Sequence, residues 1–361
     1  MLGAAACLVF LVPASAACLY WLALTVAGLL PHRRAAEANA ELTFAVLIPA
    51  HDEEGSLPAT LRSVAALDYP ADRVRVLVVA DNCTDGTAAV ARAHGADCVV
   101  REDRGRCGKG FAVAHGMNAL RHLAQDVVLI LDADCELSPN SLREFAAAFT
   151  GGAVVAQAAV RSRNADDGPG GYVAAVGAAV DDAVARGRQR LGGSAPLRGT
   201  GMAFGRSVLD QIQWDTASAV EDADYARQLR AAGLSVRLCG GAVVSCDAPA
   251  AVGDLCRQRR RWVGTGPLAS KPLGLVHLLA TVAVCAASGA FGWWAAGLVL
   301  LTAAVYGRAV LAVGLSRRRV GLVLLSPVVV MRLVGVALTG LARGSVTTWD
   351  RTPRPLAGRA A

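Results

Sequence analysis

Long apolar stretches at both ends of the chain constrain its fold more than any other feature of the sequence. Residues 2–30 contain no charged side chain, and apolar residues dominate again from residue 273 onward. A membrane-spanning helix needs about 20 apolar residues, so the first stretch suffices for one span and residues 273–315 for two. A cleavable signal peptide is the alternative for the first stretch. However, no basic segment precedes it, and it continues well past the cleavage-like residues 14–16.

Arginine clusters beside these stretches predict the orientation of the chain. Arginines at 33–34 follow the first stretch, and arginines at 317–319 follow the second. Because such segments stay in the cytoplasm, we expect a multi-pass protein of the inner (cell) membrane with its middle domain in the cytoplasm. The last apolar stretch, residues 320–341, is interrupted by Pro327 and Arg332. We expect it to lie in the membrane interface as an amphipathic helix, which leaves three spans.

The sequence therefore predicts four consecutive parts. They are an N-terminal transmembrane helix in residues 1–32, an α/β domain in residues 42–266, a transmembrane hairpin in residues 271–316, and an interfacial amphipathic helix with a basic tail in residues 320–361.

Composition argues against two other classes of protein. The net charge of +7 could indicate a nucleic-acid partner, but aromatic residues make up only 5% of the chain and the arginines cluster beside apolar stretches. We expect membrane lipid as a partner and no nucleic acid. The ten cysteines are scattered without a Cys-x-x-Cys pair, which favours a reduced, cytoplasmic environment over a disulfide framework.

Short β-branched strands alternate with helical stretches between residues 43 and 160, which predicts a doubly wound, mainly parallel sheet. The expected strands are residues 44–48, 74–80, 98–101 and 127–131, and the expected helices are residues 56–67, 87–94 and 110–123. Such sheets bind ligands at the carboxyl ends of their strands. Asp52, Asp81 and Asp132 each come at or just after the end of a predicted strand, so this edge of the sheet is the expected site.

Asp132 and Asp134 stand two residues apart at the end of an apolar strand. Two carboxylates in this arrangement can share one hard cation that also bridges two phosphate oxygens, and Mg²⁺ and Mn²⁺ accept such ligands. Carboxylates are also common in turns, so the pattern alone is weak. Its place at the end of a buried strand favours a metal site.

A second acidic group, Glu221 and Asp222, opens a predicted helix. Acidic residues favour the first turn of a helix in any case. The functional alternative is that Asp222 is a general base, which takes the proton of an attacking hydroxyl. The sequence alone leaves both possibilities open.

Gln258, Arg261 and Trp262 lie on one face of a predicted helix just before the membrane hairpin. Arginine and glutamine there can hold a departing diphosphate, and tryptophan can stack on a sugar ring. The alternative is a basic cluster that meets anionic lipid. Lys109 likewise can contact a diphosphate or be an ordinary loop lysine.

The order of these motifs resembles that of family 2 glycosyltransferases, most closely the cellulose, chitin and hyaluronan synthase-like branch. The motifs occupy residues 49–54, 81–87, 108–110, 132–134, 199–201, 221–222 and 258–262. The resemblance implies a GT-A fold with a mixed, mainly parallel sheet in residues 42–266, and inverting, metal-dependent transfer from a nucleotide diphosphate sugar.

The resemblance also implies a role for each matching residue. Asp52, Glu54 and Asp81 would contact the nucleotide-sugar, as would Lys109, Asp132, Gln258 and Arg261. Asp132 and Asp134 would hold Mg²⁺ or Mn²⁺, and Asp222 would be the base. Trp262 and Gly201 would line the acceptor site.

Three functions remain open from the sequence. The first is extension of a polysaccharide from a UDP-sugar at the cytoplasmic membrane face. The second is transfer of a single sugar to a lipid. The third is a non-catalytic subunit that binds nucleotide-sugar, which the intact set of carboxylates disfavours. Three spans form no obvious pore in one chain, so polysaccharide secretion would need a homo-oligomer or an export partner.

Overall fold

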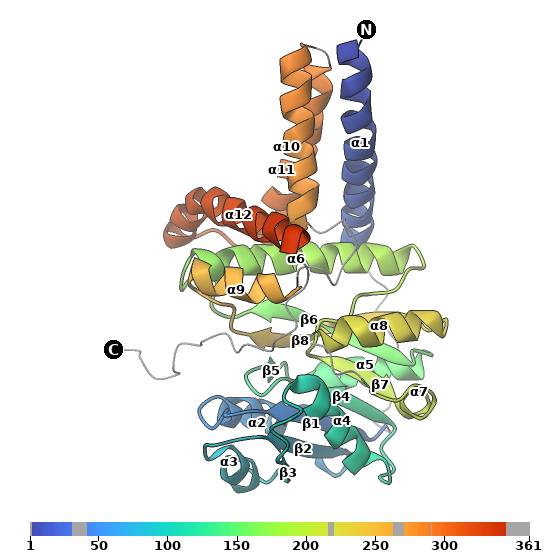
Figure 1. Ribbon diagram of the computed structural model, residues 1–361. Helices are drawn as coiled ribbons and strands as arrows, with labels where there is room; N and C mark the ends of the chain where they lie inside the picture. Colours follow the sequence, from blue (N-terminus) through green and yellow to red (C-terminus); the bar gives the residue numbers. More distant parts are fainter. Residues whose placement is uncertain (1, 31–41, 216–219, 263–270, 290, 344–361) are drawn as a thin grey trace. The chain divides into compact units, whose positions relative to one another are not determined.

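The computed structural model describes residues 2–30, 42–215, 220–262, 271–289 and 291–343. Contacts divide the chain into two compact units, which are described separately below (Figure 1). The α/β unit contains Pro31–Arg163 and Gly192–Asp247, and the helical unit contains Met1–Leu30, Asn164–Leu191 and Ala248–Val346. Residues 164–191 and 248–262 lie within the predicted α/β domain of residues 42–266, yet they group with the apolar helices.

The α/β unit is built on an eight-stranded sheet with the strand order β3-β2-β1-β4-β7-β6-β8-β5. The strands are β1 (Phe44–Ala50), β2 (Val74–Asp81), β3 (Asp97–Arg101), β4 (Val127–Ile130), β5 (Glu136–Leu137), β6 (Val155–Ser162), β7 (Met202–Gly205) and β8 (Val236–Cys246). β1 to β4 pair in parallel, β7 is antiparallel to both β4 and β6, and β8 is parallel to β6. The mixed, mainly parallel sheet predicted from the sequence is confirmed.

Helices connect these strands. They are α2 (Leu57–Ala65), α3 (Thr87–Ala93), α4 (Lys109–Leu120), α5 (Ser141–Thr150), α7 (Arg206–Gln211) and α8 (Glu221–Ala231). The four predicted strands correspond to β1–β4, and the three predicted helices correspond to α2, α3 and α4. β7 and its antiparallel pairing were not predicted.

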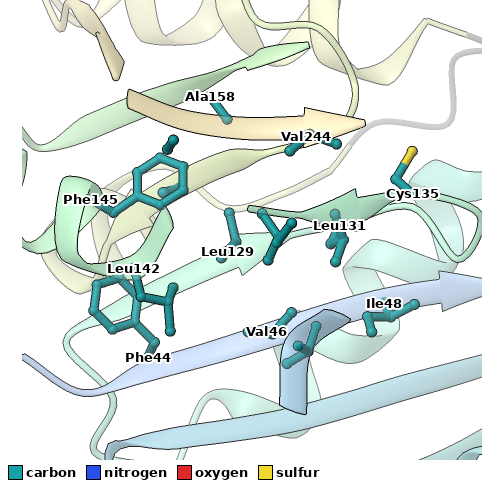
Figure 2. Close-up of a cluster of buried hydrophobic side chains, with 14 of the residues drawn as sticks. Phe44, Val46, Ile48, Leu129, Leu131, Cys135, Leu142, Phe145, Ala158 and Val244 are labelled. Carbon is teal, nitrogen blue, oxygen red and sulfur yellow. The ribbon is translucent and has the colours of Figure 1, made fainter. Parts of the chain in front are cut away.

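Burial on both faces explains why β1 and β4 are continuous apolar runs. Every residue of β1 and of β4 is buried, as expected for parallel strands covered by helices. In the core, Phe44 and Val46 of β1 lie near Leu129 of β4 and Phe145 of α5 (Figure 2). Gly116 lets α4 approach the sheet closely, because a Cβ there would lie 2.3 Å from Leu47 Cδ1.

Two cysteines of the α/β unit are joined, contrary to the expectation that the cysteines are reduced. Cys135 and Cys246 form a disulfide across a sequence separation of 111 residues. The physical reason is the antiparallel pairing of β5 with β8, in which Glu136 stands opposite Ser245. Spacing along the sequence could not reveal this pairing.

The helical unit contains α1 (Leu2–Leu29), α6 (Pro169–Arg190), α9 (Val252–Trp262), α10 (Lys271–Ser288), α11 (Gly292–Val313) and α12 (Arg317–Arg343). α1, α10 and α11 lie side by side, and residues such as Leu11, Cys285 and Leu298 form their shared core (Figure 1). α6 packs on α1 through glycine, since a Cβ on Gly187 would lie 1.8 Å from the carbonyl oxygen of Leu24.

Three helices in the described part of the chain are long and apolar enough to cross a membrane. They are Cys7–Leu29, Gly292–Val313 and Arg317–Gly340. α10 contributes a shorter apolar stretch, Gly274–Ser288. The number matches the sequence prediction, but α12 replaces α10 in the set, because α12 continues as a helix through Pro327. The interfacial placement of α12 and the span by α10 stay predictions, and the basic tail at 344–361 lies outside the described residues.

Candidate active site

Side chains from three distant segments of the α/β unit meet around Lys109, the first residue of α4. Lys109 Nζ lies 2.5 Å from Asp132 Oδ1, beyond β4, and 3.4 Å from Glu221 Oε1, at the start of α8. It also donates a hydrogen bond of 2.7 Å to the carbonyl oxygen of Gly199. The structure thus brings together three residues that are far apart in the sequence.

The surroundings of Lys109 keep it charged. Burial by itself would lower the pKa of the ammonium, but the nearby carboxylates of Asp132 and Glu221 outweigh burial and hold the pKa above its usual value. Lys109 is therefore a fixed positive charge at neutral pH. Such a charge can neutralise a diphosphate.

Asp132 and Asp134 follow β4, and the backbone of each is hydrogen-bonded to a side chain from another segment. The amide of Asp132 donates to Thr200 Oγ1 at 3.1 Å, and Arg163 Nη2 donates to the carbonyl oxygen of Asp134 at 3.2 Å. Ligand atoms of the two aspartates and of Cys135 lie within 4.8 Å of one another. Because the Cys135 sulfur is in the disulfide, the two carboxylates are the remaining donors of this group. Oxygen donors of this kind fit Mg²⁺ or Mn²⁺.

Asp222 lies in the first turn of α8, beside Glu221. Its Oδ1 accepts a hydrogen bond of 2.8 Å from the amide of Ala223, and its Oδ2 lies 3.7 Å from the point where a Cβ on Gly199 would stand. Burial raises the pKa of Asp222, and the charge of Lys109 opposes this shift. A carboxylate with a raised pKa accepts a proton more readily, as a general base must.

Glu221 has a role that the sequence did not reveal. It is 8% exposed, and burial raises the pKa of its carboxyl group while Lys109 opposes the shift. The N-terminal position in α8 suits both acidic residues. The ion pair with Lys109 adds a specific partner for Glu221 that helix capping alone does not require.

The predicted nucleoside residues lie at the ends of the neighbouring strands β1 and β2. The Asp52 carboxylate accepts a hydrogen bond of 2.6 Å from the amide of Thr84. Asp81 is 4% exposed and pairs at 2.5 Å with Arg101. His51 links the two strand ends, because its Nδ1 lies 2.7 Å from the carbonyl oxygen of Asp81.

Arg101 was not identified from the sequence. It ends β3 directly opposite Asp81 in the parallel register, so the pairing of two predicted strands was the signal that could have revealed it. Its guanidinium also lies 5.5 Å from the ring centroid of Phe111, within the range of a cation–π contact.

Two other predicted residues have clear structural contacts. Glu54 Oε2 accepts a hydrogen bond of 2.7 Å from the amide of Gly86, which joins the loops after β1 and β2. Gly201 has a φ of 65°, and a Cβ there would lie 2.7 Å from Val244 Cγ2. Packing thus accounts for the glycine at 201, and its predicted acceptor contact stays a prediction.

Gln258, Arg261 and Trp262 lie on α9 in the helical unit. Gln258 is half-buried. The side chains of Arg261 and Trp262 lie outside the described residues, so their proposed contacts with diphosphate and acceptor also stay predictions.

Known proteins share sequence similarity with this chain. A family model described as "Glycosyltransferase like family 2" matches residues 41–265. The beta-monoglucosyldiacylglycerol synthase of Synechocystis sp. is 27% identical over 229 residues, which are 61% of this chain and 47% of that protein. An uncharacterized glycosyltransferase of Mycobacterium tuberculosis is 38% identical over 108 residues, which are 30% of this chain and 44% of that protein. The chain thus spans about half the length of these curated relatives, and neither is named a cellulose, chitin or hyaluronan synthase.

A solved structure supports the fold. The mannosyltransferase PcManGT from Pyrobaculum calidifontis, in complex with GDP-Man and Mn²⁺, has a TM-score of 0.61 at 18% identity. The match covers 94% of this chain and 99% of that chain. The GT-A fold predicted from the motifs is confirmed. Since the family model covers more than half of the sequence, the chain belongs to the glycosyltransferase-like family 2.

Proposed function

We propose that the chain is an inverting glycosyltransferase that moves a hexose from a nucleotide diphosphate sugar to a lipid acceptor at the cytoplasmic face of the cell membrane. The observation that carries this proposal is the convergence of Lys109, Asp132, Glu221 and Asp222. In this cluster we assign Lys109 as the fixed cation, Asp132 as a ligand of the metal and Asp222 as the base. Uridine as the nucleoside is an expectation from the family resemblance.

Asp222 and Lys109 have different tasks in the proposed reaction. Asp222 takes the proton of the acceptor hydroxyl while the hydroxyl oxygen forms a bond with the anomeric carbon. The bond from that carbon to the phosphate oxygen breaks, and its electron pair leaves with the nucleoside diphosphate. Lys109 stabilises the charge that develops on the diphosphate. A single displacement with the base opposite the leaving group inverts the anomeric centre.

Asp132 and Asp134 would hold Mg²⁺ or Mn²⁺, which supplies further positive charge for the diphosphate oxygens. Oδ1 of Asp132 lies 2.5 Å from Lys109 Nζ, and the same carboxylate would hold the metal together with Asp134. Lys109 therefore orients the carboxylate on which the cation depends.

A lipid acceptor is here preferred to a polysaccharide acceptor, which the sequence placed first. It is supported by the name of the Synechocystis relative, which denotes a glycolipid product, and by the apolar helices that would keep the chain at a lipid surface. Polysaccharide extension is the second candidate, favoured by Gln258-x-x-Arg261-Trp262. A homo-oligomer or export partner belongs to that candidate alone.

The deciding experiment supplies the full-length protein in lipid nanodiscs with radiolabelled UDP- and GDP-sugars, with diacylglycerol present or absent. We expect a product of one sugar per lipid that extracts into organic solvent. Asp222→Asn is the control and should yield no product. Long water-soluble chains would support the polysaccharide alternative. Absence of transfer from every donor to any acceptor would reject the proposal.

A further inference from the structure

A fully buried polar side chain, Gln157, lies beneath the loop that carries the Lys109 contact. Gln157 is on β6 and is 0% exposed. Its Oε1 accepts a hydrogen bond of 3.0 Å from the amide of Arg198. Its Nε2 donates to the carbonyl oxygens of Thr200 at 2.8 Å and of Ala158 at 3.0 Å. Gln157 is thus hydrogen-bonded to the backbone on both sides of Gly199.

This loop, residues 198–201, contacts both Lys109 and Asp132. Gly199 offers its carbonyl oxygen to Lys109 Nζ at 2.7 Å. Thr200 Oγ1 accepts a hydrogen bond of 3.1 Å from the amide of Asp132. The amide of Gly201 donates to the carbonyl oxygen of Ile130 in β4 at 2.9 Å. One short loop therefore contacts both the fixed cation and the strand end that bears the metal-binding carboxylate.

The loop needs such support from outside. Gly199 and Gly201 have φ values of 79° and 65°, and glycine loses more conformational freedom on ordering than any other residue. A glutamine amide is suited to hold this backbone, because its oxygen accepts from an N–H while its nitrogen donates to a carbonyl. An apolar side chain would fill the same space in the core without fixing the loop.

We propose that Gln157 is a positioning residue for transfer: it fixes the Arg198–Gly201 loop and thereby sets the positions of Lys109 and Asp132. This inference rests on the proposed function for its effect on rate. The placement of the loop itself can be tested without activity. Gln157 does not touch the reacting atoms, so its effect passes through the loop.

The test compares Gln157→Met, which keeps the length of the side chain and removes its hydrogen bonds, with Val155→Ala. Val155 is also 0% exposed on β6, so its truncation weakens the same strand without removing a hydrogen bond to the loop. Hydrogen–deuterium exchange of the full-length protein in nanodiscs is the first measurement. The amides of Arg198 and Asp132 should exchange at least about tenfold faster in Gln157→Met than in Val155→Ala. Equal exchange in the two variants overturns the inference.

Steady-state kinetics is the second measurement. A displacement of about 1 Å can cost about 100-fold in rate, so Gln157→Met should lower kcat by about 10- to 100-fold. The donor KM should change by less than about threefold, because the nucleoside contacts at Asp52 and Asp81 remain. Val155→Ala should keep kcat within about threefold of wild type. If Gln157→Met also keeps kcat within about threefold of wild type, the positioning role is rejected. If the wild-type chain transfers no sugar, the proposed function fails while the exchange result still decides the role of Gln157.

Discussion

The ammonium of Lys109 lies 2.5 Å from Oδ1 of Asp132 and 3.4 Å from Oε1 of Glu221, so one cation fixes both acidic groups of the site. Lys109→Met should leave the half-buried Asp132 and the buried Glu221 without their partner and remove one counter-charge of the diphosphate. Loss of one such electrostatic contact costs about 100- to 1,000-fold in kcat. Initial rates at saturating donor measure the effect.

Arg92→Met on α3 is a suitable control, because Arg92 is exposed and belongs to no part of the site. It should change kcat by less than about twofold. If Lys109→Met were as active as the control, the assignment of Lys109 to the diphosphate would be wrong.

The proposed role of Asp222 as the base predicts how transfer depends on pH. Burial raises the pKa of Asp222 above its usual value, and only the deprotonated carboxylate accepts a proton. Activity should therefore fall as the pH drops through this raised pKa. Lys109 opposes the shift, so Lys109→Met should raise the pKa further and move the acidic limb of the kcat profile to higher pH. A profile that moves to lower pH, or an unchanged one, would contradict the coupling of the two residues.

The metal assignment predicts a graded response. EDTA should stop transfer, and Mg²⁺ or Mn²⁺ should restore it. Asp134→Asn should raise the metal concentration for half-maximal activity by about tenfold or more, since one anionic ligand is lost. Undiminished turnover in chelator would remove the metal role from both Asp132 and Asp134. A titration of the metal at saturating donor distinguishes weaker binding of the ion from a lower maximal rate.

Local pattern predicted the first half of the sheet well. Strands β1, β2 and β4 are mainly apolar and end at or just before acidic residues, so their parallel order also predicted that Asp52, Asp81 and Asp132 share one edge. The second half depends on pairings between distant segments. β7 lies antiparallel between β4 and β6, and no short-range signal marks such an insertion.

The contacts of the site were harder to predict than its charged residues. Carboxylates at strand ends are visible in a sequence, whereas the Gly199 carbonyl and the Gln157 amide act through backbone geometry. α6 lies within the predicted domain of residues 42–266 but groups by its contacts with the apolar helices. Its packing on α1 depends on the close approach at Gly187, which is a property of two surfaces and not of one helix.

The disulfide between Cys135 and Cys246 predicts a contribution to stability. In the chain-entropy account, closing a loop of about 100 residues stabilises the fold by up to about 5 kcal/mol, and typical values are about 2–4 kcal/mol. Cys246→Ser should lower the free energy of unfolding by about that amount. Reductant should lower the stability of the wild type and have little effect on the variant.

Cys107→Ser is the matched control for the disulfide, because Cys107 is an exposed free thiol. It should unfold like the wild type. If reductant leaves the stability of the wild type unchanged, the two sulfurs are not joined in solution, as a cytoplasmic domain would favour.

In the proposed membrane topology, α12 decides on which side of the membrane the last residue of this sequence lies. Arg317–Gly340 has a mean hydropathy of 2.3 and is long enough to span, but Arg332 interrupts its apolar face and is itself exposed. An arginine at the centre of a span costs about 3 kcal/mol. An interfacial helix would instead let that side chain reach water.

We therefore expect the C-terminus to be cytoplasmic, so a C-terminal green fluorescent protein should fluoresce and a C-terminal alkaline phosphatase should be inactive. The Arg332→Leu variant removes the obstacle to spanning while keeping the helix. If the wild-type phosphatase fusion is active, α12 crosses the membrane and the interfacial assignment is wrong.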